Sequence, residues 1–285
     1  MPRAIVLNSA SAANITGSTF GSALVANAGD SLSVANYVNG GAKILEFWGI
    51  DSDSVAEGEL IYTRPDSTHD QQHGFRFEIP SAALGGAGTN AAFNFLPGYG
   101  TIDLYKSDTP QILFTGTTGD DILVSWVTLY DDLPGVHGVF CTWPYIQQHQ
   151  KSALGIQVTA VASGTPGAYG AQRAFNADDD RLHANTWYAI LGASVQIQVT
   201  TISLLGPDWG GQRIGMPAGS LDLRSNTWFV DQAVKWNNLA CIPVFNSNNK
   251  GNVLVQVADG EASTSPKIDF FLYELDVPNT QTPEG

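Results

Sequence analysis

Short segments of similar sequence recur about half a chain length apart, and this internal repeat constrains the fold more than any other feature. The matching segments are FEIPSAAL (77–84) and IGMPAGSL (214–221), NAAF (90–93) and NTWF (226–229), FWGI (47–50) and WYAI (187–190), and the LY pairs at 129–130 and 272–273. Their offsets of 137, 136, 140 and 143 residues are all close to half of the 285-residue chain. Loop insertions account for the drift, because loops tolerate length changes at little cost. The pattern indicates a duplicated domain; the alternative is that two β-rich stretches share aromatic and proline positions by coincidence.

Two domains are therefore expected, an N-terminal one over residues 1–140 and a C-terminal one over residues 141–285, with the boundary inside segment 134–151. A short linking helix is predicted over residues 143–152, since Pro144 suits the first helical position and Gly155 would lie just past the end. Shorter helices are predicted after Pro80 and after Pro217.

Apolar residues alternate with other residues along most of the chain, and this period of two is typical of half-buried β-strands. The clearest sets are Ile122, Val124 and Trp126; Val195, Ile197 and Val199; and Ile268, Phe270 and Leu272. Turn residues such as those at 118–121, 206–208 and 248–251 divide these runs. The predicted fold class is all-β, with strands also expected around residues 60–62 and 75–79.

Each domain is expected to be an eight-stranded jelly-roll β-sandwich, in which two four-stranded sheets pack face to face. The competing fold is an immunoglobulin-type sandwich. That fold usually needs only about 100 residues and favours a Cys…Trp…Cys arrangement, which this chain lacks.

Composition and charge exclude several functional classes. The formal net charge of −14 gives no attraction for phosphate backbones or anionic lipid, so direct nucleic-acid binding is not expected. No apolar run approaches the roughly 18 residues of a membrane-spanning helix, and the short run at residues 4–7 does not resemble a secretory signal. Cys141 and Cys241 have no neighbouring ligands at zinc spacing and are expected to be buried thiols.

Candidate metal ligands are few in the sequence. His69 and His73 have the spacing of two ligands on one helical face, but they lie in a polar stretch between predicted strands, which favours a loop. The remaining histidines, His137, His149 and His183, are scattered. The acidic groups at 178–180 and at Asp51 and Asp53 could offer oxygen ligands to calcium, yet they lack the spacing of a calcium loop, so solvated turns are favoured.

Catalytic signatures are also weak. Residues 119–121 (GDD) are interpreted as a hairpin turn, and the glycosylation match at residues 14–16 as accidental. The chain has no Gly-x-Ser-x-Gly motif, and its 27 acidic residues make a pair of neighbouring carboxylates unavoidable and therefore undiagnostic. We expect no enzyme, no catalytic residue, no cofactor-binding residue, no metal site and no cofactor. Trp126 is expected in the core, whereas Trp209 lies among turn residues and is expected to be exposed, at a subunit interface or under a sugar ring.

Two tandem jelly rolls joined by a short helix-bearing connection resemble the double jelly-roll major capsid proteins of icosahedral viruses and phages. The resemblance covers nearly the whole chain through the four repeated segments. It implies a structural virion protein that forms pseudo-hexagonal homotrimers, which tile an icosahedral shell together with other capsid or vertex proteins. It further implies a location in the virion capsid, assembly in the host cytoplasm, and a lipid membrane as a neighbour that can lie beneath the shell.

Charge and the N-terminal segment bear on this expectation. Residues 1–142 carry 5 basic and 15 acidic groups, a net charge of −10, whereas residues 143–285 carry 8 and 12, a net charge of −4. The two halves are therefore not interchangeable. The first 42 residues hold a single basic residue, Arg3, so the chain has no basic arm for a genome. Residues 9–27, rich in Ser, Ala and Gly, are expected to become ordered only on assembly.

Two other functions remain open. Jelly rolls also serve as lectins, so a glycan-binding or receptor-binding protein is the first alternative. The second is a double jelly-roll hydrolase acting on carbohydrate or glycopeptide, which would require a cleft with paired carboxylates.

Overall fold

The structure is a computed structural model that describes the strand backbones of the first half and most of the second half. The described residues are 3–12, 17–23, 25–26, 30–31, 43–51, 57–63, 75–79, 93–94, 102–103, 109–116, 122–131, 139–161, 169–195, 199–209, 213–217, 225–235, 240, 242–259 and 265–283. Several features singled out in the sequence lie outside them: residues 14–16, 81–84, 119–121 and 218–224, and His69, His73, Asp53, His137 and Cys241. Side-chain positions are discussed only for residues 139–283.

The described strands of the first half form two larger antiparallel sheets. The first sheet has the order β1-β11-β5-β8, and β9 also pairs with β5. Its strands are β1 (Arg3–Ala12), β5 (Lys43–Asp51), β8 (Phe93–Asn94), β9 (Ile102–Asp103) and β11 (Ile122–Asp131). The second sheet has the order β2-β10-β6-β7, formed by β2 (Gly17–Ala23), β6 (Glu57–Thr63), β7 (Phe75–Ile79) and β10 (Thr109–Gly116). A small hairpin joins β3 (Val25–Ala26) to β4 (Asp30–Ser31).

The second half also forms two antiparallel sheets. The larger has the order β12-β19-β15-β21-β13, with β18 also paired to β15. Its strands are β12 (Phe140–Cys141), β13 (Gln150–Thr159), β15 (Trp187–Val195), β18 (Ser225–Trp228), β19 (Ile242–Asn246) and β21 (Lys267–Leu275). The smaller has the order β14-β20-β16-β17, formed by β14 (Arg173–Ala174), β16 (Val199–Leu205), β17 (Arg213–Pro217) and β20 (Leu254–Asp259). The helical segments are α1 (Trp143–His149), α2 (Phe229–Lys235) and the 3₁₀ turns η3 (Pro207–Trp209) and η4 (Ser247–Asn252).

Eight strands of each half have the same order, and the larger sheet of the second half adds β12 and β19. Strands β1, β11, β5 and β8 of the first sheet correspond in order to β13, β21, β15 and β18 of the larger sheet in the second half. Strands β2, β10, β6 and β7 of the second sheet correspond in the same way to β14, β20, β16 and β17 of the smaller sheet. The four repeated sequence segments lie on or beside these counterparts, namely β5 and β15, β7 and β17, β8 and β18, and β11 and β21. The expected all-β class is confirmed.

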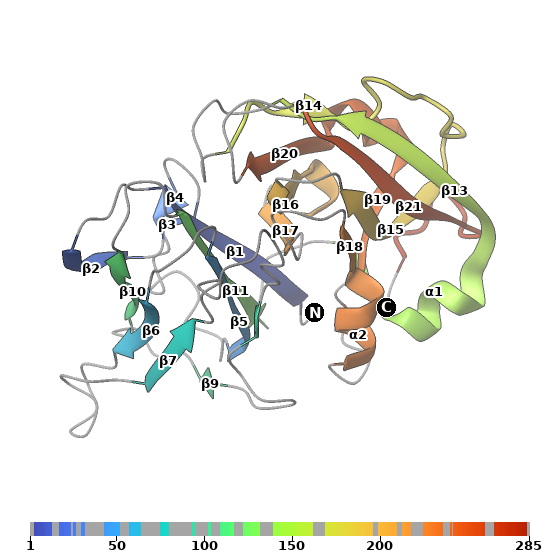
Figure 1. The fold of residues 1–285 in the computed structure, drawn as a ribbon. Coiled ribbons are helices and arrows are strands. Elements are labelled where there is room, and N and C mark those ends of the chain that lie inside the picture. The colour runs from blue at the N-terminus through green and yellow to red at the C-terminus, as the bar shows by residue number, and fades with distance from the viewer. Residues whose placement is uncertain are drawn as a thin grey trace.

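The strands of the first half gather on the left of Figure 1 and those of the second half on the right. Strand β1 of the first half runs towards the second half and lies in contact with β17 (Figure 1). Residues within segment 9–27 form part of β1 and β2 in this single chain, where they pair with β11 and β10. The described residues of this segment thus have pairing partners within the chain, and its ordering on assembly stays a prediction.

The linking helix is shorter than expected. Thr142 caps α1 because its Oγ1 accepts a hydrogen bond from the Tyr145 amide at 3.3 Å, and a proline occupies the first turn. The helix ends at His149 rather than at residue 152, and Gly155 lies inside β13 instead of past a helix end. The physical reason is the pairing of Gln150–Thr159 with β21, which requires extended backbone immediately after α1.

Two other sequence predictions differ from the structure. The alternation at 195–199 indicated one strand, but β15 ends at Val195 and β16 begins at Val199. Helix α2 was not predicted, although Phe229 and Ala233 are buried one turn apart, as on the inner face of an amphipathic helix. Neither helix among the described residues has the length and apolarity to cross a membrane.

The described core lies between the two sheets of the second half. Along β21, Ile268, Phe270 and Leu272 are buried and alternate with more exposed residues, as the sequence predicted. The rings of Phe175 and Phe270 have centroids 4.9 Å apart. Close aromatic packing of this kind adds to the free energy gained by burying apolar surface.

Candidate functional site

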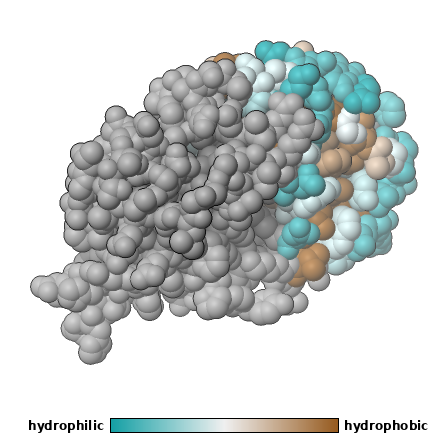
Figure 2. Space-filling model, viewed as in Figure 1, coloured by the Kyte–Doolittle hydropathy of each residue, from teal (hydrophilic) through white to brown (hydrophobic). Residues whose placement is uncertain are grey.

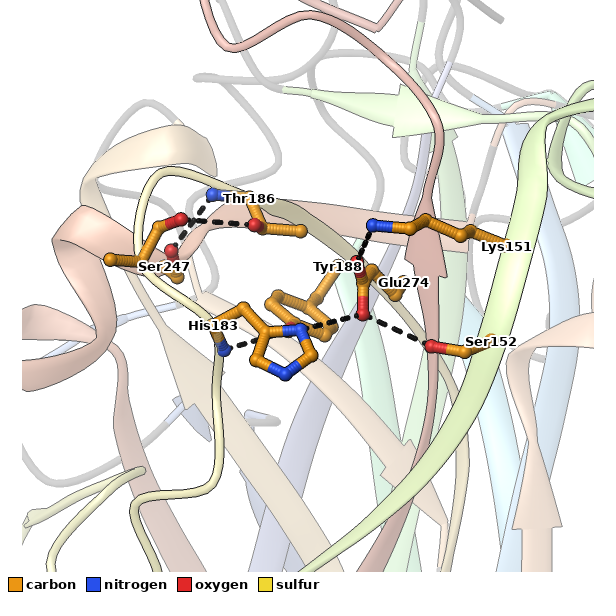
Figure 3. Close-up of polar contacts among 8 residues, drawn as sticks. Lys151, Ser152, His183, Thr186, Tyr188, Ser247 and Glu274 are labelled. Carbon is orange, nitrogen blue, oxygen red and sulfur yellow. Dashed lines mark hydrogen bonds and ion pairs between the residues drawn. The ribbon is translucent and has the colours of Figure 1, made fainter.

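A buried carboxylate, Glu274 near the end of β21, is the centre of a polar cluster where α1 meets β13. Its side chain is only 3% exposed. Oε1 accepts a hydrogen bond from Lys151 Nζ at 2.6 Å, and Oε2 accepts from Ser152 Oγ at 3.0 Å. The Nδ1 atom of His183 lies 3.0 Å from the same Oε2. Figure 3 shows the carboxylate enclosed by these three side chains.

The loop carrying His183 is held in place by backbone contacts. The His183 amide donates to the hydroxyl of Tyr188 at 2.9 Å, and the Thr186 amide donates to Ser247 Oγ at 3.0 Å (Figure 3). Asn185 has a φ of 55°, a left-handed conformation that Asn tolerates better than most residues. These contacts position the imidazole against Glu274.

Electrostatics keep Glu274 ionised. The hydrogen bond from Lys151 is the largest cause that lowers the pKa of Glu274 below its ordinary 4.5; burial opposes this, and Ser152 and His183 add to it. The same pair raises the pKa of Lys151, chiefly through the hydrogen bond. Burial raises the pKa of the Tyr188 hydroxyl, so that group stays neutral. The cluster is therefore built around one charged pair, Lys151 and Glu274.

The arrangement is not that of a nucleophilic triad. In a Ser-His-acid triad the imidazole lies between the hydroxyl and the carboxylate. Here the carboxylate lies between them, and Ser152 donates directly to Glu274. The hydrogen bonds of Glu274 join the start of β13 to the end of β21. The cluster therefore secures the point where the linking helix enters the second half.

The acidic turn, defined as Asp178, Asp179 and Asp180, has a structural role. Asp178 accepts from the Thr159 amide at 2.6 Å and pairs with Arg173. Asp179 pairs with Arg181, whose guanidinium also donates to the Gly155 carbonyl, and Asp180 pairs with Lys250. The Arg173 hydrogen bond, followed by that of the Thr159 amide, lowers the pKa of Asp178.

These contacts bear on the sequence interpretation of the turn. The sequence favours a solvated turn over a calcium site, and the structure pairs each of the three carboxylates with a cationic side chain. Two of the contacts satisfy backbone groups of β13, the edge strand of the larger sheet, and so obstruct the addition of another strand there. No group of three or more potential metal ligands occurs among the described residues.

An aromatic row crosses the outer face of the larger sheet. Register places Trp228, Gly192, Phe271 and Gly155 side by side on β18, β15, β21 and β13. Because the central residue is a glycine, the rings of Trp228 and Phe271 meet across it, stacked with centroids 5.0 Å apart. Phe271 is 37% exposed. The next register position carries polar residues, including Asp269, which accepts from Gln157 at 2.8 Å.

Apolar side chains thus reach the surface of the second half. Figure 2 shows brown atoms between teal margins on the right-hand face, the side on which β13, β21 and α1 lie in Figure 1. Tyr273 stacks on Trp143 of α1 with ring centroids 6.3 Å apart. Val234 of α2 is 52% exposed. This face is a candidate surface for intermolecular contact.

Trp209 is not the exposed aromatic residue that the sequence indicated. It is completely buried, and its indole Nε1 donates to the Val244 carbonyl at 3.0 Å. The turn residues around it fold into η3, where Asp208 accepts from the Asn246 amide and from Asn249. Turn chemistry indicates backbone shape but not whether a neighbouring segment covers the turn. Among the residues whose side chains the structure describes, the exposed aromatic residue is Phe271, which the alternation identified only as a strand residue.

The remaining residues that the sequence analysis singled out lie on different helices and strands. Cys141 is a buried free thiol, as expected, and burial raises its pKa to about 12. His149 at the end of α1 has its Nδ1 2.9 Å from the Tyr145 carbonyl oxygen. Asp51 lies on β5 and Trp126 on β11, where only the backbone is described. Glu274 follows the repeated LY pair at 272–273, and nothing in its local sequence marks it as the centre of a cluster.

Comparisons with known proteins give structural neighbours alone. No family model and no curated protein matches the sequence. The major capsid protein P2 from bacteriophage PM2 matches with 10% identity over 96% of this chain and 98% of that chain, at a TM-score of 0.26. A chain of the cowpea mosaic virus top component matches with 10% identity over 100% of this chain and 91% of that chain, at a TM-score of 0.20. A chain of infectious bursal disease virus, Gx strain, matches with 10% identity over 99% of this chain and 74% of that chain, at a TM-score of 0.18. Scores this low do not establish a shared fold.

Proposed function

We propose that the chain is a tandem pair of jelly rolls, residues 1–140 and 141–285, and acts as the major capsid protein of an icosahedral virus or phage. The strand order carries this proposal. If the strands of an eight-stranded jelly roll are numbered along the chain, one sheet has the spatial order 1-8-3-6. The other sheet has the spatial order 2-7-4-5. The order β13-β21-β15-β18 with β14-β20-β16-β17 fits this scheme, and so does its counterpart in the first half.

A second observation supports duplication. In the second half a cation at the start of the first strand, Lys151, pairs with an acid at the end of the last strand, Glu274. In the first half the register places Arg3 opposite Asp131 at the corresponding ends of β1 and β11. Strand β12 pairs with β19, so Phe140, the last residue of the proposed first domain, already pairs with a strand of the second half.

Self-association is the proposed activity. Three copies of a chain with two like domains give six sandwiches, a block that can tile a lattice in which each block has six neighbours. The unequal charges of the halves, −10 and −4, allow the two kinds of domain to make different contacts. The proposed setting is the virion capsid, assembled in the host cytoplasm with vertex proteins and, where one is present, an underlying membrane.

The size of the protein in solution tests the proposal. Three chains of 30.3 kDa give a species of about 91 kDa in sedimentation-velocity experiments. Electron microscopy of particles containing the protein should show a regular shell of such blocks. A chain that remains strictly monomeric at high concentration contradicts the proposal.

A glycan-binding protein is the second candidate, and one observation favours it. The aromatic row lies next to the polar side chains of Asp269 and Gln157, and aromatic rings flanked by hydrogen-bonding groups suit sugar recognition. Binding of the purified protein to a glycan array, abolished by F271T, would support this function over the first.

A further inference from the structure

The aromatic row has an open position at its β13 end. The register places Trp228 and Gly155 on opposite sides of Phe271. One face of the Phe271 ring packs on Trp228, with ring planes 22° apart, so the other face is turned towards Gly155. Gly155 has no side chain to cover that face, and Phe271 is 37% exposed. We call the space above Gly155 and beside the ring the Gly155 position.

The Gly155 position has room for an added group. A Cβ built on Gly155 would have a single atom within 4 Å, the Phe270 carbonyl oxygen at 3.9 Å, which is an ordinary van der Waals distance. A side chain would therefore fit there without displacing its neighbours. A ligand that occupies the same space lies against the ring of Phe271.

Hydrogen-bonding groups border the Gly155 position on two sides. Gln157 and Asp269 occupy the next register position on the same face of the sheet, where Gln157 Nε2 donates to Asp269 Oδ1 at 2.8 Å. This bond leaves the Gln157 side-chain carbonyl and Asp269 Oδ2 as acceptors. At the edge of the sheet, the Arg181 guanidinium donates through Nη2 to the Gly155 carbonyl and carries further N–H donors.

We propose that the Gly155 position binds the ring of a neutral hexopyranose, stacked on Phe271. A pyranose has a face of C–H bonds that packs on an aromatic ring, and hydroxyl groups around its rim that donate to and accept from polar side chains. The acceptors of Gln157 and Asp269 and the donors of Arg181 suit that rim. This inference rests on the glycan-binding candidate, to which it adds a site and a ligand class, and it does not depend on the capsid role.

Charge favours a neutral sugar over an acidic one. The chain has a net charge of −14, and the carboxylate of Asp269 lies next to the Gly155 position. The Arg181 guanidinium is already paired with Asp179. A sialic acid, uronic acid or sulfated sugar would bring another negative charge to Asp269, where like charges repel. The hydroxyls of a hexose or an N-acetylhexosamine instead donate to the carboxylate.

A glycan array probed with the full-length wild-type chain tests the ligand class. The array carries glycans that end in neutral hexoses or N-acetylhexosamines, together with sialylated, uronic-acid and sulfated glycans. We expect binding to the neutral set. A preference for the acidic set overturns the assigned ligand class but leaves glycan binding in place. Binding to none of the glycans contradicts both this inference and the glycan-binding candidate, and leaves the capsid role untouched.

Filling the Gly155 position tests the site. G155V adds a side chain where a Cβ has room, and valine suits a strand, so the variant should fold while the position is blocked. The Kd for the neutral glycan that binds most strongly, measured by isothermal titration calorimetry, should rise about tenfold or more. T159V, four residues along β13 on the same face, is the matched control and should leave the Kd unchanged. An unchanged Kd in folded G155V overturns the assigned site, while glycan binding itself stands.

Replacement of the ring tests the stacking contact. F271L keeps an apolar side chain but removes the aromatic face, so the Kd for the same glycan should rise about tenfold. Circular dichroism checks the folding of each variant, and if F271L does not fold, G155V decides. An unchanged Kd in folded F271L contradicts stacking of the sugar on this ring.

Discussion

Glu274 illustrates how a single buried charge can hold two strands and a loop together. Its carboxylate satisfies the ammonium group of Lys151 and the hydroxyl of Ser152 on β13, and it orients His183. A buried charge without partners would be strongly unfavourable, so the three neighbours are as necessary as the carboxylate itself. Local sequence could not predict this cluster, because its members come from positions 151, 152, 183 and 274.

Replacement of Glu274 should destabilise the protein in a pH-dependent way. E274Q is expected to lower the free energy of unfolding by about 1–3 kcal/mol at neutral pH, because the cationic and hydroxyl donors lose their ionised acceptor. The pKa of Glu274 is lowered in the folded state, so its contribution is complete above 4.5 and is lost as the pH falls through the folded pKa. Urea denaturation of both proteins at pH 7 and in acid measures the difference.

The control for this prediction is D276N, which changes an exposed acid two positions away. It should shift stability by much less than E274Q. A stability difference between wild type and E274Q that grows on acidification would contradict the assigned charge state.

Gly206 shows why a turn residue can be intolerant of substitution even without unusual backbone geometry. A Cβ added there would lie 3.0 Å from two ring atoms of buried Trp209. G206A is expected to lower stability by about 1–3 kcal/mol through overpacking. G251A is the matched control, since the atom nearest to a Cβ built at Gly251, Asn176 Oδ1, is 4.0 Å away. Equal midpoints of urea unfolding for the two variants would contradict this account.

At the scale of elements, the acidic turn acts on β13 rather than on a metal. Exposed sheet edges invite pairing with other chains, and proteins commonly protect them with charged side chains. Asp178 and Arg181 provide that protection through the Thr159 amide and the Gly155 carbonyl. The three adjacent carboxylates were visible in the sequence, but their partners became apparent only when β13 and the turn were brought together.

Removal of Asp178 should open the β13 edge. In D178A the Thr159 amide loses its acceptor, and its hydrogen exchange is expected to become about tenfold faster. D180A is the control, because Asp180 pairs with Lys250 of η4 rather than with the described residues of β13. Unchanged exchange at Thr159 in D178A, measured by mass spectrometry or NMR, would show that another group protects the edge.

At the scale of the whole molecule, the described core of the second half is formed entirely by residues from 140 onward, with Val139 packed against it. A fragment of residues 139–285 is therefore expected to fold by itself, since it retains both sheets and the β12–β19 pairing. Cooperative urea unfolding and a β-type circular dichroism spectrum would support this. A fragment without a cooperative transition would mean that the halves depend on one another for stability.

The sequence by itself determined the all-β class, the alternating core positions of β21 and the repeat that relates β5, β7, β8 and β11 to β15, β17, β18 and β21. These features are local, because a strand exposes alternate faces whatever it packs against, and a duplication preserves short segments wherever they lie. Tertiary structure decided which aromatic ring is exposed, where α1 ends and what the acidic turn binds. Trp209 is buried because β19 lies over its turn, whereas Phe271 stays partly exposed although Trp228 stacks on its ring. Burial depends on contacts between distant segments, and short-range pattern carries no information about those contacts.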